Sequence, residues 1–572
     1  MAKRRKKRRR RKGSRLAPVL VMLLLLIVVA GAGIITSMLK KYSPSDARMS
    51  LADYYGQETE GELVLILQDR ILEERGKIAD NIAYIPYQVV AQEMGGRFYW
   101  DQESGQMLYT TPTQIQRIDP ETSSYEAGDE TVSLDYTIVK ELEGQYYIAL
   151  DFLEEHMEIK GTLYENPDRA VIICDWGTVN TVAAREDSVI RYQGGIKSPI
   201  LSDVQKGQEF ILLEQLDNWS RVMSADGIDG YVENKGLGAA QETEYVYDGP
   251  YEENFTSLTR DYKINLAWHQ VTSEAANQAL GQTIQNVTGV NVISPTWFSV
   301  VSTEGAISSL ASSDYVNQAH AKGMEVWGLI DNFNDQVSTL ETLSSGSARA
   351  HIIEKLLEEA RRVGMDGINL DFEALTQEEA PHFLQFVREL SVACRNNKLV
   401  LSIDNPVPQY TAFYNRKEQG ILADYVIIMG YDEHTVGSEQ PGSVASLPFV
   451  EEGIVQTLKE VPKEKVINGV PFYTRLWTQS NNGVVTSEVF GMDEADAYVQ
   501  EHGMDVYWNK DVSQNYAEAQ IDTGVLKMWL EDEESLEEKL KLIEQYELAG
   551  VAAWKLGFER PDVWGVISKY IQ

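Results

Sequence analysis

One octapeptide of this chain predicts both a buried strand and a functional site: Asp366-Gly367-Ile368-Asn369-Leu370-Asp371-Phe372-Glu373. Side chains alternate across a β-strand with a period of two. Asn369, Asp371 and Glu373 therefore fall on one face, whereas Leu370 and Phe372 fall on the other. Burying polar or ionisable groups costs free energy unless they are paired or used in chemistry. We therefore expect the polar face of this strand to carry a site.

Around this stretch, residues 255–572 alternate between strand-like and helical segments. The apolar runs that are candidate strands are 264–268, 292–297, 324–330, 367–372, 399–403, 425–429, 466–471 and 550–554. Helical spacing of apolar residues fits 348–363, 379–396 and 534–547. This size and alternation predict a catalytic (β/α)8 TIM barrel.

Polar side chains gather where these candidate strands end. They are Asp371 and Glu373, Asp404 and Asn405, Tyr431 and Asp432, Tyr473 and Arg475, and Lys555 after Trp554. The active sites of such barrels lie at the carboxyl ends of the strands. The pattern therefore predicts a cleft at this end, lined by acids and aromatic rings.

Four ordered segments of this domain resemble glycoside hydrolase family 18. The octapeptide matches the Asp-x-x-Asp-x-Asp-x-Glu pattern of that family, with Asn369 in place of one Asp. The other three matches are Met429-Gly430-Tyr431-Asp432, Gly469-Val470-Pro471-Phe472-Tyr473-Thr474-Arg475 and Trp554. The chain looks most similar to the bacterial spore-cortex and cell-wall-lytic branch, to judge from Ser294-Pro295-Thr296-Trp297-Phe298 and Gly430-Tyr431-Asp432-Glu433-His434. That branch often carries Asn at the position of Asn369.

The resemblance implies substrate-assisted catalysis, in which the 2-acetamido group of the sugar replaces the nucleophilic carboxylate of ordinary retaining glycosidases. It implies Glu373 as the acid, Asp371 as the group that orients the acetamido nitrogen, and Tyr431 as a partner of the same group. Burial and a neighbouring carboxylate should raise the pKa of Glu373. The residues expected to bind substrate are Asp432, Trp554, Trp297, Tyr473, Arg475, Asn369 and Asp366. No cluster has metal-ligand spacing, and no cofactor is expected.

Two smaller modules precede the barrel. Residues 61–177 are predicted to be an α+β module whose segment Phe98-Tyr99-Trp100-Asp101, after Gly95-Gly96, resembles the amino-terminal repeat of copper amine oxidases, without implying a copper site. Residues 178–240 resemble a small all-β bacterial Src-homology-3-like (SH3-like) domain through Trp219-Ser220-Arg221-Val222 and Gly230-Tyr231-Val232. Such domains commonly bind cell-wall peptides. The alternative for the first module is a spacer without a ligand. The alternative for the second is that Trp219 and Tyr231 only pack in its hydrophobic core.

The amino terminus predicts a membrane anchor. Residues 1–15 form a basic cytoplasmic tail, 16–39 an uncharged transmembrane helix, and 40–60 a polar linker. About 20 apolar residues span a bilayer. The bases precede the span, which predicts a single pass in the cell membrane with an extracytoplasmic catalytic domain. A cleaved signal peptide remains the alternative, because Ala30-Gly31-Ala32-Gly33 offers small residues for cleavage.

The charge distribution argues against a nucleic-acid partner. Residues 1–41 contain 13 of the 51 Lys and Arg residues and no acid, which leaves 38 bases against 87 acids, a net charge of −49. An ectodomain this acidic repels polyanions, although salt screens the repulsion beyond roughly 8–10 Å.

These observations lead to one expected function and two alternatives. We expect a membrane-anchored N-acetylglucosaminidase that cleaves β-1,4 bonds at N-acetylglucosamine in peptidoglycan, because an anchored enzyme with a wall-binding-like module meets that polymer first. The alternative within the enzyme class is hydrolysis of chitin or chitooligosaccharides. The alternative outside it is a non-catalytic glycan-binding barrel, but relatives of that kind usually lose the acid that corresponds to Glu373.

Overall fold

A computed structural model describes residues 16–571 except residues 58 and 60. The chain divides into two compact units. One comprises the residues up to Met94 together with Lys140–Glu252, and the other comprises Gly95–Val139 together with Glu253–Gln572. The predicted basic tail, residues 1–15, lies outside the described residues.

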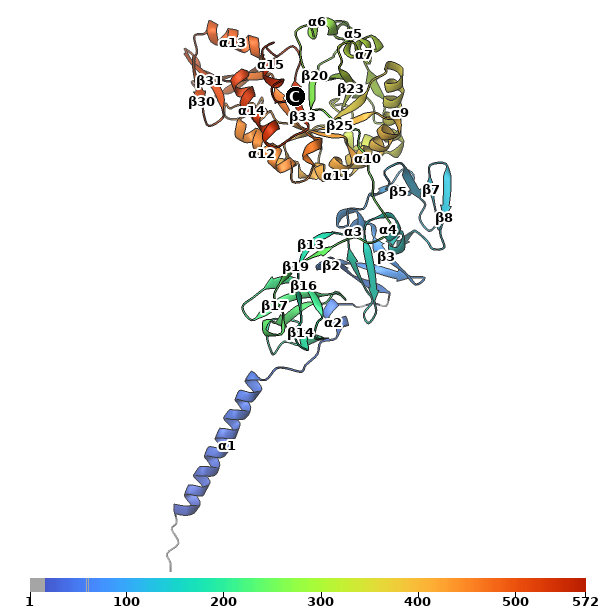
Figure 1. The fold of residues 1–572 in the computed structure, drawn as a ribbon, viewed down its shortest axis with the longest axis vertical. Coiled ribbons are helices and arrows are strands. Elements are labelled where there is room, and N and C mark those ends of the chain that lie inside the picture. The colour runs from blue at the N-terminus through green and yellow to red at the C-terminus, as the bar shows by residue number, and fades with distance from the viewer. Residues whose placement is uncertain (1–15, 58, 60, 572) are drawn as a thin grey trace, which may run out of the picture. The chain divides into compact units, whose positions relative to one another are not determined.

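The first unit begins with helix α1 (Leu16–Tyr42), which is drawn in blue in Figure 1. It is long and apolar enough to cross a membrane, with a mean hydropathy of 3.0. Its only charged residues, Lys40 and Lys41, lie in the last turn, where cations interact favourably with the helix dipole. The helix ends three residues beyond the predicted segment. Its length and composition fit either a membrane span or a signal sequence.

The first sheet of this unit has seven strands in the order β11-β12-β1-β2-β3-β10-β9. Its strands are β1 (Glu62–Leu67), β2 (Arg70–Ala79), β3 (Ile82–Pro86), β9 (Val139–Leu142), β10 (Gln145–Ala149), β11 (Lys160–Tyr164) and β12 (Arg169–Ile173). The short helices with it are α2 (Leu51–Tyr55), α3 (Tyr87–Gln92) and α4 (Leu150–His156). Strands β3 and β10, each followed directly by a helix, pair antiparallel.

The second sheet of this unit also has seven strands, in the order β15-β14-β18-β17-β16-β13-β19. They are β13 (Gly177–Ala183), β14 (Ser188–Arg191), β15 (Ile200–Val204), β16 (Glu209–Gln215), β17 (Trp219–Ser224), β18 (Asp229–Glu233) and β19 (Gln241–Tyr245), with a 3-10 turn, η1 (Asn234–Gly236). Its core contains Val182, Phe210 and Val232, whereas Trp219 and Tyr231 are only half-buried. The all-β prediction for this region is confirmed. The last strand lies beyond residue 240, where the predicted domain ends.

The second unit is built on a closed barrel of parallel strands (Figure 1). Its strands are β20 (Ile264–His269), β21 (Val292–Val300), β23 (Glu325–Asp331), β24 (Gly367–Asp371), β25 (Val400–Pro406), β26 (Tyr425–Met429), β27 (Val466–Pro471) and β33 (Gly550–Trp554). Pairing of β20 with both β33 and β21 closes the ring. A short strand, β22 (Ile307–Ser309), pairs antiparallel with β21. The predicted (β/α)8 barrel is confirmed.

Helices and 3-10 turns connect these strands. They are α5 (Glu274–Gln278), α6 (Leu280–Thr283), α7 (Ser313–His320), α8 (Thr339–Ser344), α9 (Gly346–Val363), α10 (Ala380–Asn397), α11 (Arg416–Leu422), α12 (Leu447–Thr457), α14 (Glu533–Gln545), α15 (Val563–Ile567), η2 (Pro408–Tyr410), η3 (Ala412–Tyr414) and η4 (Lys463–Lys465). Helix α9 leads into the octapeptide, and Gly364 ends it at φ 80°, a left-handed conformation that glycine adopts without strain.

The octapeptide alternates as its sequence predicts. Ile368 and Leu370 pack in the core between the strands and the helices, and Phe372 stacks on Phe383 and Phe386 of α10. Asn369 and Asp371 point into the barrel. The strand ends at Asp371, so Glu373 lies in the loop that follows it.

A sheet from the amino-terminal half of the chain belongs to the barrel unit. Its strands, in the order β4-β5-β6-β7-β8, are β4 (Phe98–Asp101), β5 (Gln106–Thr110), β6 (Ile115–Ile118), β7 (Ser124–Ala127) and β8 (Glu130–Ser133). Buried Arg349 of α9 holds it, 3.5 Å from Asp101 and 5.0 Å over the Tyr99 ring. Residues 95–139 therefore fold with the barrel, although the predicted 61–177 module includes them.

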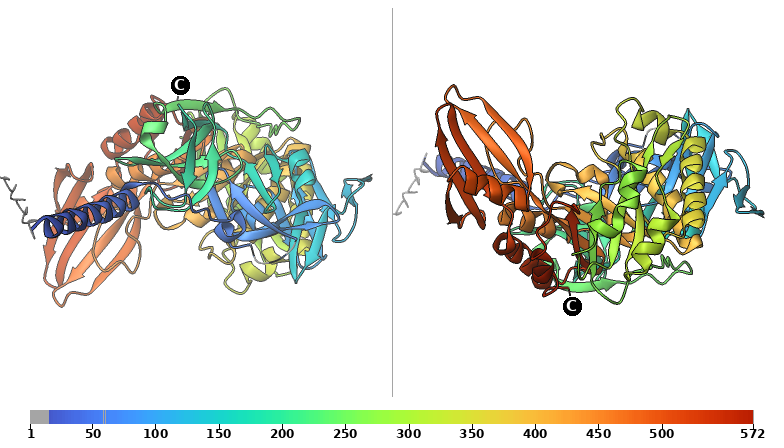
Figure 2. Two further views of the ribbon diagram at one scale, coloured as in Figure 1. Left: turned by 90° about the horizontal axis from the view of Figure 1, so that it is seen from below. Right: turned by 90° about the horizontal axis from the view of Figure 1, so that it is seen from above.

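A further sheet is inserted between β27 and α14, and the sequence analysis did not predict it. Its strands, in the order β29-β28-β32-β31-β30, are β28 (Tyr473–Ser480), β29 (Val485–Gly491), β30 (Asp505–Asn509), β31 (Gln514–Ile521) and β32 (Gly524–Leu530), and it carries helix α13 (Met492–Glu501). It appears in orange to red in Figure 2 and has its own core, which includes Leu476, Ala517 and Met528. The insertion begins at the carboxyl end of β27, so it contributes its first residue, Tyr473, to the barrel mouth.

Candidate active site

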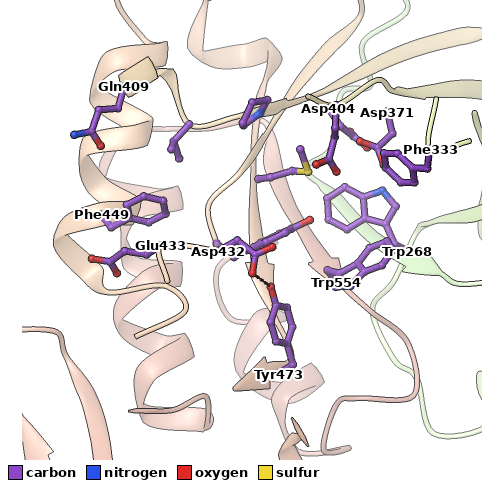
Figure 3. Close-up of a pocket in the computed structure, with 15 residues that line it drawn as sticks. Trp268, Phe333, Asp371, Asp404, Gln409, Asp432, Glu433, Phe449, Tyr473 and Trp554 are labelled. Carbon is purple, nitrogen blue, oxygen red and sulfur yellow. Dashed lines mark hydrogen bonds between the residues drawn. The ribbon is translucent and has the colours of Figure 1, made fainter. Parts of the chain in front are cut away.

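A pocket of about 610 Å³ opens at the carboxyl ends of the barrel strands (Figure 3). Its lining consists of Trp268, Phe333, Asp371, Glu373, Asp404, Pro406, Val407, Gln409, Met429, Tyr431, Asp432, Glu433, Phe449, Tyr473 and Trp554. Most of these side chains come from the ends of strands or from the first residues after them. The barrel therefore brings together acids that are far apart in the sequence.

Three aspartates lie side by side on neighbouring strands. Asp331 of β23 is the register partner of Asp371 of β24. Asp404 of β25 comes directly after the pair formed by Leu370 and Ile403, which places it beside Asp371. Asp371 and Asp404 are 5% and 1% exposed. Two members of this row, Asp371 and Asp404, line the pocket.

Asn369 lies beneath this row and is completely buried. Its Oδ1 accepts hydrogen bonds from the Trp268 indole (2.9 Å) and from the Ser294 hydroxyl (2.9 Å). Its Nδ2 donates to Ser402 Oγ (3.0 Å) and to Asp404 Oδ1 (2.8 Å). Both the oxygen and the NH2 group of the Asn369 amide are therefore hydrogen-bonded to other side chains. These bonds connect β24 to β20, β21 and β25.

Glu373 is held through its backbone. Asn332, in the loop after β23, accepts the Glu373 N–H at 2.9 Å and donates to the Glu373 carbonyl at 3.1 Å. These two bonds fix the loop that follows β24 while leaving the carboxyl group in the pocket. Burial, and then the charges of Asp432 and Asp331, raise the pKa of Glu373. The shift favours a protonated side chain, as an acid catalyst needs.

The pKa values of the two adjacent aspartates are raised as well. Burial, followed by the charges of Asp404, Glu373 and Asp331, raises the pKa of Asp371 well above its ordinary value. Burial is also the main cause that raises the pKa of Asp404 to about 8, although the hydrogen bond from Asn369 opposes the shift. None of Asp371, Glu373 and Asp404 forms an ion pair with a lysine, arginine or histidine in the described part of the chain.

Tyr431 and Tyr473 form one wall of the pocket, and Tyr473 is hydrogen-bonded to Asp432. Tyr431 follows β26, and its ring meets Trp268 and Tyr473 edge-on at 6.4 and 6.3 Å. The Tyr473 hydroxyl donates to Asp432 Oδ1 at 2.6 Å (Figure 3). Burial raises the pKa of Tyr431 well above its ordinary value, so its hydroxyl keeps its proton and can donate a hydrogen bond.

Two indoles lie next to the carboxyl groups. Trp554 ends β33 and Trp268 lies near the end of β20, with ring centroids 6.0 Å apart. Trp268 is buried, whereas Trp554 is partly exposed and lines the pocket. An exposed indole face provides an apolar surface on which a sugar ring can pack.

Four residues expected to bind substrate do not line this pocket. Trp297 is buried between strands and helices, where its indole donates to Asn277 Oδ1 at 2.9 Å. Asp366 precedes β24, at the opposite end from Glu373, and accepts the Val326 N–H. Asn369 is buried as described above. We therefore assign these three to structural roles. The fourth, Arg475, lies behind the pocket wall, 3.9 Å from Asp432.

Asp404 is among the polar residues expected at the strand ends, and it lines the pocket. Trp268 and Met429 also line the pocket and end candidate strands, but they are not among the predicted site residues. Asn332 and Phe333 lie in a loop whose sequence gave no such signal. Within residues 16–571, leaving aside 58 and 60, no group of three or more His, Cys, Asp or Glu side chains could hold a metal ion.

A (β/α)8 barrel with a glutamic acid of raised pKa, adjacent buried carboxyl groups and a partly exposed indole at its strand ends has the characteristics of a glycoside hydrolase. Residues 299–559 match the family described as glycosyl hydrolases family 18. Most of the barrel therefore resembles the family 18 glycosyl hydrolases, which supports a glycosidase. Residues 70–173 match the copper amine oxidase N-terminal domain.

Individual relatives agree with this assignment. The uncharacterized glycosylase YvbX of Bacillus subtilis is 26% identical over 322 residues, which are 52% of this chain and 92% of YvbX. The cortical fragment-lytic enzyme of Bacillus subtilis is 24% identical over 247 residues, which are 41% of this chain and 56% of that enzyme, little more than half of its length. The crystal structure of the Bacillus cereus spore cortex-lytic enzyme SleL matches with a TM-score of 0.50 at 19% identity, and it covers 57% of this chain and 79% of that one. This last likeness shows the fold alone.

Proposed function

We propose that this protein is a membrane-anchored, extracytoplasmic N-acetylglucosaminidase that cleaves β-1,4 bonds of peptidoglycan by substrate-assisted, retaining catalysis. The observation that carries the proposal is the convergence of Glu373, Asp371 and Tyr431 in one pocket beside Trp554. Glycosidic cleavage needs an acid beside a charge-stabilising group. These residues supply both.

Glu373 is the proton donor. In the first step its proton moves to the glycosidic oxygen while the bond from that oxygen to the anomeric carbon breaks. The oxygen of the sugar's acetamido group forms a bond to the same carbon, which gives a cyclic oxazolinium ion. A water molecule then attacks the anomeric carbon, the bond from that carbon to the acetamido oxygen breaks, and the Glu373 carboxylate takes one proton of the water. Two inversions at one carbon retain its configuration.

Asp371 and Tyr431 hold the acetamido group during these steps. Asp371 Oδ1 is buried and has no hydrogen-bond partner in the described structure, so it can accept the acetamido N–H. The carboxylate also stabilises the positive charge that develops on the oxazolinium ion. The Tyr431 hydroxyl donates to the acetamido oxygen, and Trp554 packs against the sugar ring.

Peptidoglycan is the proposed substrate for two reasons. One of the relatives is named a cortical fragment-lytic enzyme. In addition, an anchor in the cell membrane keeps an extracytoplasmic domain next to the wall. We propose that α1 is this anchor, with residues 1–15 in the cytoplasm, because the bases precede the span. The SH3-like module would then contact wall peptides.

The test uses the full-length protein in detergent. It measures release of reducing ends from purified peptidoglycan and from chitin oligosaccharides, with products identified by mass spectrometry. We expect cleavage of peptidoglycan with N-acetylglucosamine at the new reducing end. Glu373→Gln should lower kcat roughly 10²–10⁴-fold, the usual contribution of acid catalysis. Protease added to intact spheroplasts should degrade the barrel.

Glu464→Gln is the matched control, because Glu464 is exposed on η4, at the amino end of β27. It should keep full activity. Equal activity in Glu373→Gln and wild type would remove Glu373 from its role. Turnover of chitin oligosaccharides alone would identify a chitinase, and binding without turnover by the wild type would identify a glycan-binding protein.

A further inference from the structure

We propose that Asp404 is a positioning residue that shares one proton with Asp371, so that this pair of buried carboxyl groups carries a single negative charge. The inference rests on the proposed function, because it concerns the state in which Asp371 meets the substrate. It is supported by the orientation of the Asn369 amide, by the place of Asp404 beside Asp371, and by the acidic groups around the pair.

The first is the orientation of the Asn369 amide. An indole N–H can only donate a hydrogen bond, so the Asn369 atom that faces Trp268 must be the oxygen. The Ser294 hydroxyl bonds to the same atom. Asn369 therefore turns its NH2 group towards Asp404 and donates to Asp404 Oδ1. A protonated carboxyl group keeps an acceptor oxygen, so this bond is compatible with a proton on the other oxygen of Asp404.

The second is the place of Asp404 beside Asp371. The register of β24 and β25 puts the two residues at the same level of the barrel, and both carboxyl groups line the pocket (Figure 3). Asp371 Oδ1 accepts no hydrogen bond from any described group. A proton held between the two carboxyl groups allows one to donate a hydrogen bond to the other, while Asp371 Oδ1 stays available for the substrate.

The third is the charge around the pair. The titratable groups that face Asp404 are Asp371 and Glu373 from the segment of β24 and Tyr431 after β26, and Asp331 of β23 faces Asp371 and Glu373. All are acidic. Adjacent buried carboxyl groups without a cation cannot all be ionised. At least one of them must therefore hold a proton in addition to the proton of Glu373.

The hydrogen bonds to Asp331 limit this proton to two of the aspartates. Asp331 accepts the Ser299 hydroxyl at 2.8 Å and the Phe333 N–H at 3.1 Å, and both bonds favour its charged form. Burial favours the neutral form of both Asp371 and Asp404. The proton is therefore shared between these two carboxyl groups, and Asp371 carries the negative charge when it accepts the acetamido N–H.

This arrangement explains how β24 can work with an asparagine at position 369. The Asn369 amide has no charge and cannot exchange a proton with Asp371. It holds Asp404 in place by a hydrogen bond, so β25 supplies the carboxyl group that shares a proton with Asp371. The acid that supports Asp371 thus comes from β25 and not from the octapeptide.

The experiment compares Asp404→Asn with Asp404→Ala in the full-length protein. An asparagine at 404 can still donate to Asp371 but cannot titrate, whereas an alanine does neither. We expect Asp404→Ala to lower kcat about 10–100-fold, which corresponds to loss of a hydrogen bond to a charged group, with KM little changed. Asp404→Asn should retain more of the kcat. The alkaline limb of its pH profile should become less steep, because one of two titrating protons is gone.

A second readout needs no substrate. Infrared difference spectra between pH 6 and pH 10 should contain a protonated-carboxyl band in the wild type that Asp404→Asn lacks. Asp424→Asn is the matched control, because Asp424 is also buried but lies at the other end of the barrel, before β26. Asp424→Asn should retain both the protonated-carboxyl band and the steep alkaline limb of the pH profile.

A double variant, Asn369→Asp with Asp404→Asn, moves the carboxyl group from one strand to the other. Trp268 and Ser294 already donate to position 369, so we expect this variant to regain the steep alkaline limb. An unchanged band and limb in Asp404→Asn would overturn the inference, as would equal losses in Asp404→Asn and Asp404→Ala. Full activity of Glu373→Gln would instead overturn the proposed function, while the infrared band would still report on Asp404.

Discussion

Glu373 is poorly suited to carry a charge, and this property links the site to the stability of the fold. Its carboxyl group is mostly buried near Asp432 and Asp331, and burial is the largest cause of its raised pKa. The neutral acid suits catalysis. The same surroundings make the ionised form unfavourable in the folded protein. Glu373 therefore lowers the free energy of unfolding at alkaline pH.

We therefore predict that Glu373→Gln stabilises the protein at high pH. A carboxyl group whose folded pKa is raised gives stability that is complete below its unfolded pKa, about 4.3 for Glu, and that is lost as pH rises through the folded pKa. Glutamine does not titrate, so the variant should melt at a higher temperature than the wild type at pH 8. Each kcal/mol gained in the free energy of unfolding raises the melting temperature by roughly 2–4 °C.

The measurement is thermal unfolding at pH 4 and pH 8, followed by circular dichroism. The difference in melting temperature should shrink towards zero at pH 4. Glu464→Gln should melt like the wild type at both values. A stabilisation by Glu373→Gln that is equal at the two pH values would point to packing and not to titration.

At the scale of elements, the close approach of two strands sets the position of Tyr431. Gly430 follows β26, and a Cβ atom at this residue would lie 2.8 Å from both Asn468 Oδ1 and the Gly469 carbonyl oxygen of β27. Real Cβ atoms do not approach that closely. The Met429-Gly430-Tyr431-Asp432 segment therefore needs a glycine to bring the tyrosine against the neighbouring strand.

We predict that Gly430→Ala separates β26 from β27 and displaces Tyr431. A small misplacement of a group that contacts the substrate can reduce the rate about 10²-fold, so kcat/KM should fall by about that factor. Gly565→Ala in α15 is the control, because no atom lies within 4 Å of its Cβ position. Steady-state kinetics of both variants test the prediction. Equal kcat/KM values in the two variants would contradict it.

At the scale of the whole molecule, residues 95–139 are part of the barrel unit. Arg349 connects them to it, because its guanidinium contacts Asp101 and forms hydrogen bonds with Glu389 at 3.0–3.1 Å. The Arg349 side chain is fully buried. Loss of one member of such a buried charge network leaves carboxylates without a partner.

We predict that Arg349→Met lowers the free energy of unfolding of this unit by about 3–5 kcal/mol. It should also make residues 95–139 sensitive to limited proteolysis under conditions in which the barrel resists cleavage. Arg361→Met, a change of an exposed arginine on the same helix, is the matched control and should alter neither property. Identical cleavage patterns in both variants would show that Arg349 does not hold this sheet.

Local patterns account for much of the fold. The candidate strands at 425–429, 466–471 and 550–554 coincide with β26, β27 and β33, because each is a short apolar run bounded by polar residues. The inserted sheet is absent from the prediction because polar residues interrupt the apolar residues of its strands, as in Gln514–Ile521, and Val485–Gly491 is mostly half-buried or exposed. Trp297 shows why an aromatic residue near a strand end is hard to place from sequence, since it can face either the pocket or the helices, and here it packs in the core.

The sequence by itself determined the barrel, the alternation of the octapeptide and the apolar amino-terminal helix, since each depends on the order of neighbouring side chains. Tertiary structure alone decided that Asp404 lies beside Asp371, that Asn332 holds Glu373, and that residues 95–139 fold with the barrel. The physical reason is that register between strands and burial of charge are set by contacts between segments far apart in the chain. No local pattern encodes those contacts.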